Sequence, residues 1–121
     1  MPPLAKFLLP LALAITLQPA HAQLLGLESD TNVTLTQADL DKIKTTLAQQ
    51  VHGKKLGTLA SWSNAESGNY GTLGLQKVFE RQRQRCEQIE YRLHPADKTK
   101  LSDRYILISC LQPDGTWKLS Y

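Results

Sequence analysis

The stretch CEQIEYRLHPADKTKLSDRYILISCL, residues 86–111, decides the fold of this chain. Two runs within it, 86–93 and 103–111, are rich in the branched and aromatic residues that favour strands. Between them lies Pro95, which cannot donate to a sheet and favours a loop. The stretch therefore predicts a β-hairpin, and the rest of the chain is interpreted around it.

One register of this hairpin aligns the two cysteines of the chain. With Cys86 opposite Cys110, Tyr91 faces Tyr105 on the other side of the sheet, and aromatic pairs of this kind stabilise sheets. An even number of cysteines in an exported domain favours a disulfide, and closing a loop of about 25 residues contributes roughly 3 kcal/mol. The alternative is a metal or redox pair, but the spacing is not C-x-x-C.

Residues 1–22 have the features of a secretory signal peptide. Lys6 supplies the positive charge, an apolar run follows, and Ala20-His-Ala22 is a cleavage site of the A-x-A type. A membrane anchor is the alternative, but the run is shorter than the roughly 20 residues that a spanning helix needs. We expect cleavage before Gln23 and an exported protein, in the periplasm first, with the cell surface or the external medium as alternatives.

The remaining residues have the size of one small domain. We expect a flexible lead-in over 23–34 and a single domain over 35–121. The formal net charge is +3 and falls to +2 without Lys6, which is too small a bias to predict nucleic acid as a partner. No later stretch is long and apolar enough to span a bilayer, so we expect no transmembrane anchor in the mature chain.

A helix is predicted at the start of this domain. Thr36 can cap it, and Asp39 then lies at the third helical position, where an acidic side chain is favourable. Gly53 is expected to end it. The apolar face that should pack on the sheet recurs at helical spacing and consists of Leu40, Ile43, Leu47 and Val51.

Beyond Gly57 the pattern becomes extended, with strands expected over 58–62 and 72–79 before the hairpin. The turn signal Gln112-Pro-Asp-Gly115 should fold residues 116–121 back as a last strand. The predicted fold class is α+β: one N-terminal helix packed on a small antiparallel sheet of four or five strands, stapled by one disulfide.

Residues with catalytic chemistry are few. His52 at the helix end and His94 beside a proline lack a recognisable nucleophile motif, so both are interpreted as exposed loop histidines. Glu87 and Glu90 are predicted to point to opposite faces of one strand, so they cannot form the carboxylate pair of a glycosidase. We expect no enzyme activity, no catalytic residue, no cofactor and no metal.

Two features are candidates for binding. The loop over 64–71 is dense in turn formers and carries Tyr70. The run Arg81-Gln-Arg-Gln-Arg85, if extended, projects Arg81, Arg83 and Arg85 from one face, where they can meet phosphates or an acidic partner. The alternatives are a plain connecting loop and a charged strand edge that discourages aggregation.

Several of these positions recur in a fixed order and spacing. They are Trp62, Asn64, Ser67, Gly68, Asn69, Gly71, Phe79, Cys86, Tyr91, Cys110, Asp114, Gly115 and Trp117. This order resembles the C-terminal domain of the rickettsial 17 kDa surface antigen family. The chain departs from the family at Ala65, Glu87 and Leu111, where proline, arginine and arginine are usual, and it lacks the glycine-zipper segment and lipoprotein cysteine of many members.

The resemblance implies a non-enzymatic protein of the bacterial cell envelope, a binding or structural module without catalytic residues to carry over. Its partner would be an envelope component or another exported protein. The alternatives are an inhibitor or stability module for another exported protein and, in a different class, a small hydrolase.

Overall fold

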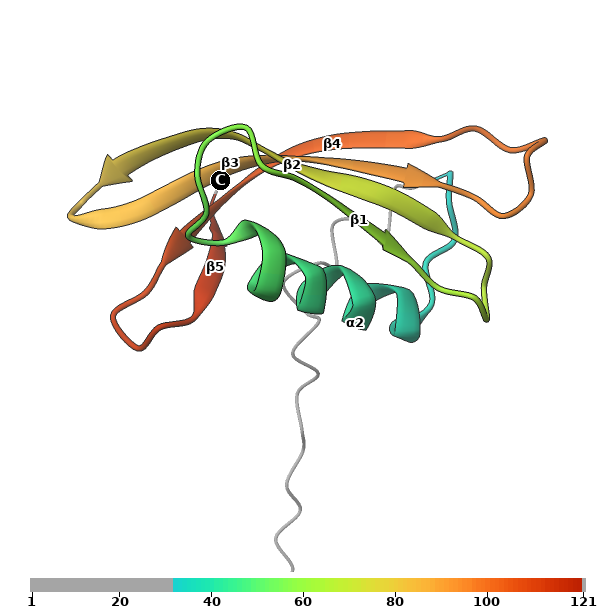
Figure 1. Ribbon diagram of the computed structural model, residues 1–121, viewed down its shortest axis with the longest axis horizontal. Helices are drawn as coiled ribbons and strands as arrows, with labels where there is room; N and C mark the ends of the chain where they lie inside the picture. The colour runs from blue at the N-terminus through green and yellow to red at the C-terminus, as the bar shows by residue number, and fades with distance from the viewer. Residues whose placement is uncertain (1–31, 121) are drawn as a thin grey trace, which may run out of the picture.

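The computed structural model describes residues 32–120 as one helix that covers one face of a curved antiparallel sheet (Figure 1). The predicted signal peptide and most of the predicted lead-in lie outside these residues. The end of the lead-in belongs to the fold, because Val33 is fully buried and its N–H donates to an Asp103 carboxylate oxygen at 2.8 Å. No helix in this described part is long and apolar enough to cross a membrane.

The helix begins as the sequence predicts. Thr36 caps α2 (Gln37–Thr46), and its hydroxyl accepts the Asp39 N–H while the Asp39 carboxylate accepts the Thr36 N–H. The helix continues as a π-helical turn, η2 (Leu47–Val51), which the sequence does not signal. Gly53 then takes φ = 77°, the left-handed conformation that ends a helix and favours glycine.

The sheet is a meander of five antiparallel strands that follow each other in space in chain order. They are β1 (Leu59–Ser63), β2 (Tyr70–Arg81), β3 (Gln84–His94), β4 (Asp103–Leu111) and β5 (Trp117–Ser120). The predicted register is confirmed, with Cys86 opposite Cys110 and Tyr91 opposite Tyr105, and the two cysteines form a disulfide. The α+β class, the five strands and the single staple are therefore as expected.

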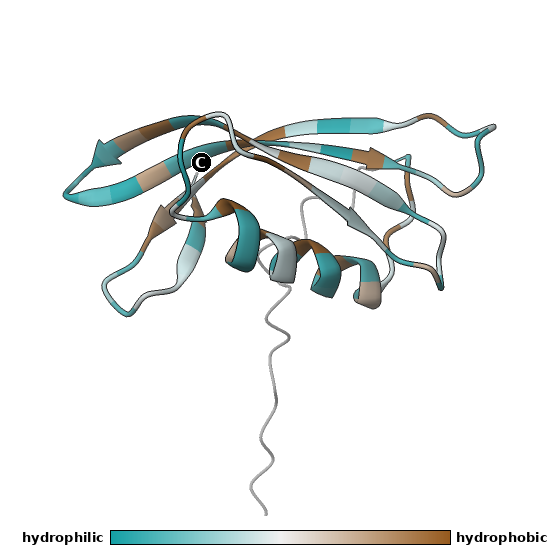
Figure 2. Cartoon of the chain, in the orientation of Figure 1, coloured by the Kyte–Doolittle hydropathy of each residue, from teal (hydrophilic) through white to brown (hydrophobic). Residues whose placement is uncertain are grey.

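The core lies between the helix and the concave face of the sheet. Figure 2 shows apolar residues along the part of the helix that faces the sheet and apolar segments within the strands. The predicted helical face, formed by Leu40, Ile43, Leu47 and Val51, is buried throughout. It packs with buried residues of β2 and β3, which are Leu73, Leu75, Ile89, Tyr91 and Leu93.

The last hairpin bends out of the sheet. Its turn is closed by the Gln112 N–H, which donates to the Thr116 carbonyl at 2.7 Å, as the Gln-Pro-Asp-Gly signal predicts. In Figure 1, β5 and this turn descend from the sheet toward the end of the helix that is formed by η2. This bend places Trp117 beside the end of the helix.

Candidate functional site

A buried carboxylate lies at the beginning of the helix. Asp39 is fully buried and accepts hydrogen bonds from Ser67 Oγ at 2.6 Å, Asn64 Nδ2 at 2.8 Å and Asn69 Nδ2 at 2.9 Å. Burial alone would raise the pKa of Asp39, but these donors and the Thr36 N–H outweigh it and hold the pKa below its usual value. The carboxylate therefore stays ionised and holds the loop after β1 against the helix.

The loop over 64–71, predicted to be exposed, is exposed only in part, because its two asparagines are buried against the helix. Gly68 has φ = 78°, and a Cβ there would lie 2.6 Å from the Ala96 Cβ. A Cβ on Gly71 would lie 1.8 Å from the Arg92 carbonyl oxygen. The glycines and amides of this motif serve close packing, and Tyr70 projects outward, 42% exposed and stacked on His94.

The predicted row of arginines is wrong, because a tight turn interrupts it. Gln82 and Arg83 have φ values of 50° and 66° and join β2 to β3, so the three side chains do not share one extended strand. Arg81 Nη1 reaches Ser120 Oγ at 3.0 Å, and Arg85 Nη2 reaches the Lys54 carbonyl at 3.0 Å. Binding by any of them, or by Tyr70 at the far end of β2, stays a prediction.

A second buried carboxylate lies beyond the end of the helix. Glu87 has a fully buried side chain, with His52 Nδ1 at 2.7 Å, the Gly53 N–H at 2.9 Å and Arg85 Nε at 3.0 Å. Burial would raise the pKa of Glu87, but these three partners outweigh it and lower the pKa. Glu87 lies on the helix side of the sheet, and Glu90 is held on the other side by Arg92, as the alternation predicts.

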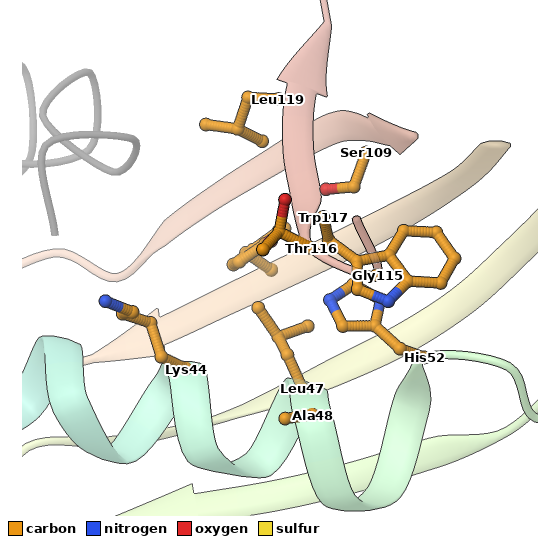
Figure 3. Close-up of a pocket in the computed structure, with 10 residues that line it drawn as sticks. Lys44, Leu47, Ala48, His52, Ser109, Gly115, Thr116, Trp117 and Leu119 are labelled. Atoms are coloured by element: carbon orange, nitrogen blue, oxygen red, sulfur yellow. The ribbon is translucent and has the colours of Figure 1, made fainter. Parts of the chain in front are cut away.

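His52 is not the exposed loop histidine that the sequence indicates. Its side chain is 10% exposed, and its ring stacks on the indole of Trp117 with centroids 4.2 Å apart and an interplanar angle of 5°. Figure 3 shows the two rings face to face where the helix ends. The stack joins the end of the helix to the start of β5, and it forms one wall of a cavity.

This cavity has a volume of about 280 Å³ and lies between the helix and the bent hairpin (Figure 3). We call it the Trp117 pocket. The described residues that line it are Lys44, Leu47, Ala48, His52, Tyr91, Ser109, Gly115, Thr116, Trp117 and Leu119. An apolar hollow with a few polar groups is the usual form of a small-molecule site, and this volume lies just below the common range, which begins at roughly 300 Å³.

Two buried residues that line the pocket, Tyr91 and Ser109, form what we call its floor, and the Tyr91 hydroxyl is unsatisfied. Tyr91 is 1% exposed, and its Oη has no hydrogen-bond partner in the described part of the chain. Burial raises the pKa of Tyr91 above its ordinary value, the Ser109 hydroxyl acts against this increase, and the charge of Glu87 adds to it. A buried hydroxyl without a partner is unfavourable, so an acceptor in the cavity would relieve it.

Sequence reasoning did not identify the pocket. The register places Tyr91 and Ser109 on the same side of adjacent strands, a relation that was available from the cysteine alignment. The approach of Trp117 to the helix depends on the bend of the last hairpin, for which the sequence carries no local signal. Residues 32–120 contain no group of three His, Cys, Asp or Glu side chains that could hold a metal ion.

Comparison of the chain with protein-family models, with curated proteins and with solved structures finds no match.

Proposed function

We propose that this protein is a non-enzymatic, exported domain of the cell envelope that binds a small molecule in the Trp117 pocket. The observation that carries the proposal is the unpartnered Tyr91 hydroxyl at the floor of a mainly apolar cavity. Binding would satisfy that hydroxyl and cover apolar side chains that the bent hairpin leaves open. Both changes favour the bound state.

Export is supported by two independent features. Residues 1–22 have the order of charge, apolar run and A-x-A site that directs secretion. The Cys86–Cys110 disulfide is of a kind that persists in oxidising compartments such as the periplasm. The resemblance to the surface antigen domain agrees with an envelope location, and the mass of the secreted product would show whether cleavage occurs before Gln23.

The binding proposal is tested by blocking the pocket from its helical wall. Ala48 lines the pocket and is exposed on η2, so Ala48→Trp should fill the cavity without disturbing the core. Gln49→Trp, on the next exposed residue and outside the pocket lining, is the matched control. Small neutral, anionic and cationic probes would be titrated into the isotopically labelled protein and followed by NMR.

At least one class of probe should shift the amide signals of Leu47 and Trp117 in the wild type and in Gln49→Trp, but not in Ala48→Trp. If no class shifts these signals, the pocket does not bind small molecules. The inhibitor or stability module, whose partner is another exported protein, would then be the better hypothesis.

A small hydrolase is the second candidate, because the same pocket contains the Ser109 hydroxyl and a histidine that is held by a buried carboxylate. A serine nucleophile needs such a histidine within hydrogen-bond reach. Among the described residues no hydrogen bond joins Ser109 to His52, and the Trp117 stack holds the imidazole. Binding is therefore favoured, and turnover of p-nitrophenyl acetate that disappears in Ser109→Ala and in His52→Ala would reverse this preference.

A further inference from the structure

We infer that the Trp117 pocket selects a small apolar molecule that carries a neutral hydrogen-bond acceptor, such as a ketone, at its inner end. This inference rests on the proposed function and names its ligand class. It follows from three properties of the pocket: the donors at its floor, the charges around them and the shape of its apolar wall.

The floor offers donors to an acceptor. The hydroxyl of Tyr91 is buried and has no partner among residues 32–120, and the high pKa of that hydroxyl keeps its proton in place. Ser109, also buried, lines the same cavity from the adjacent strand. A ligand oxygen that accepts a hydrogen bond from the tyrosine would remove the cost of leaving this buried hydroxyl unpaired. That gain in free energy favours a ligand with an acceptor.

The charge nearest the floor disfavours an anion. Glu87 lies directly opposite Ser109 in the β3–β4 register, and its negative charge already acts against ionisation of the Tyr91 hydroxyl. A ligand carboxylate at the same place would meet the same repulsion. The cationic partner Arg85 is bound to Glu87 and to the Lys54 carbonyl, and it does not line the pocket.

A cationic ligand would find no free carboxylate oxygen in this part of the pocket. Glu87 Oε1 is taken by His52, and Glu87 Oε2 accepts from the Gly53 N–H and from Arg85. An ammonium group would therefore lose its hydration without gaining a partner, which is costly in a buried site. A neutral acceptor avoids both penalties.

The apolar wall sets the size of the ligand body. Leu47 and Ala48 form the helical side, and Leu119 and the Trp117 indole form the strand side (Figure 3). A cavity of about 280 Å³ holds a single ring or a short aliphatic chain. In Figure 3 the amine of Lys44 points away from the His52–Trp117 stack, so it does not place a positive charge at the floor.

The test compares three probes that share one ring: cyclohexanone, cyclohexanecarboxylate and cyclohexylammonium. Their affinities are measured by NMR titration of the wild type, of Tyr91→Phe and of Tyr70→Phe. The last variant is the matched control, because it removes the same hydroxyl from a tyrosine on the other face of the sheet. Ser109→Ala is a second variant that keeps the test valid if Tyr91→Phe does not fold.

We expect the ketone to bind wild type at least about fivefold more tightly than either charged probe. Tyr91→Phe should weaken ketone binding roughly three- to tenfold and Ser109→Ala roughly two- to fivefold, because each loses a hydrogen bond. Tyr70→Phe should leave the affinity unchanged. The affinities of the charged probes should change less than twofold in all three variants.

Tighter binding of the carboxylate or the ammonium ion would overturn the inference and leave the proposed function standing. Ketone binding that is unaffected by both Tyr91→Phe and Ser109→Ala would also overturn it, since the hydroxyls would then have no part in selection. If none of the three probes shifts the pocket signals, the inference falls together with the proposed function.

Discussion

The two buried carboxylates lie at opposite ends of the same helix, and their partners differ. Asp39 is surrounded by neutral side-chain donors, Asn64, Ser67 and Asn69, which all come from one loop. Glu87 has a backbone N–H and two basic side chains as partners, and the Trp117 pocket lies beside it. A hollow of about 320 Å³, lined in part by Ser67 and Asn69, also lies at the Asp39 end, so the two ends differ in hydrogen bonding and not in the presence of a cavity.

At the Asp39 end the carboxylate and its loop partners form a fully bonded network. The carboxylate uses both oxygens, the amides are buried, and glycines allow the chain to approach where a Cβ would collide. At the Glu87 end the carboxylate is equally well bonded, yet a hydroxyl next to it is left without a partner. An unsatisfied group beside a cavity is the mark of a site that is completed by something else.

The largest expected effect is at the Asp39 end. Asp39→Ala removes the acceptor that Ser67 and the two buried amides of Asn64 and Asn69 share, so the free energy of unfolding should fall by about 3–5 kcal/mol. Asp41→Ala, on the exposed side of the same helix, should change it by less than about 0.5 kcal/mol. Urea unfolding measures both, and a loss below about 1 kcal/mol for Asp39→Ala would refute the structural role of this network.

Glu87→Ala should lower the free energy of unfolding by less, about 1–3 kcal/mol. The partners that lose the carboxylate can be hydrated more easily. Arg85 is 35% exposed, and the open pocket admits water to His52. Glu90→Ala, on the same strand and the opposite face, is the matched control and should cost less than about 1 kcal/mol. If Glu87→Ala proved more damaging than Asp39→Ala, the contrast between the two ends would be reversed.

Acid should destabilise both ends. The pKa values of Asp39 and Glu87 are lower in the folded protein than their ordinary values of 3.8 and 4.5, so the unfolded state binds more protons in the acid range. The stabilisation is therefore complete above the unfolded values and is lost as the pH falls through the folded ones. Unfolding measured from pH 6 to 3 should show this decline, with a shallower slope in Glu87→Gln; an equal slope in the variant would contradict it.

The smallest effect is expected at the floor of the pocket. Tyr91→Phe removes a buried hydroxyl that has no partner in the described residues, so stability should change by less than about 1 kcal/mol or rise. Thermal unfolding of the wild type and of Tyr91→Phe measures this change in stability. A loss above about 2 kcal/mol would mean that the hydroxyl is bonded in solution and is not available to a ligand.

The contrast between the two ends also explains what the sequence could predict. The helix and the hairpin carry local signals: a capping box at Thr36, apolar spacing along one helical face and two cysteines that set one register. The structure agrees with each of these. Periodicity and capping act within a few residues, so they can be recognised in a single sequence.

The predictions that differ from the structure concern places where residues distant in the sequence meet or where the sequence carries no local signal. Asn69 bonds to Asp39, which lies 30 positions earlier, so composition alone made its loop resemble an exposed one. The turn at Gln82 and Arg83 has none of the glycine or asparagine that usually marks two positive φ values. The partner of His52 is 35 positions away, and the pocket needs the bend of β5 as well.

The most direct test of the contrast is a crystal structure of the protein soaked with cyclohexanone. The ketone should occupy the Trp117 pocket, with its oxygen about 2.6–3.0 Å from Tyr91 Oη, and should be absent from the Asp39 end. A ketone bound in the hollow at the Asp39 end, against Ser67 and Asn69, or a Trp117 pocket closed by its own side chains, would contradict the claim that the ligand site lies at the Glu87 end of the helix.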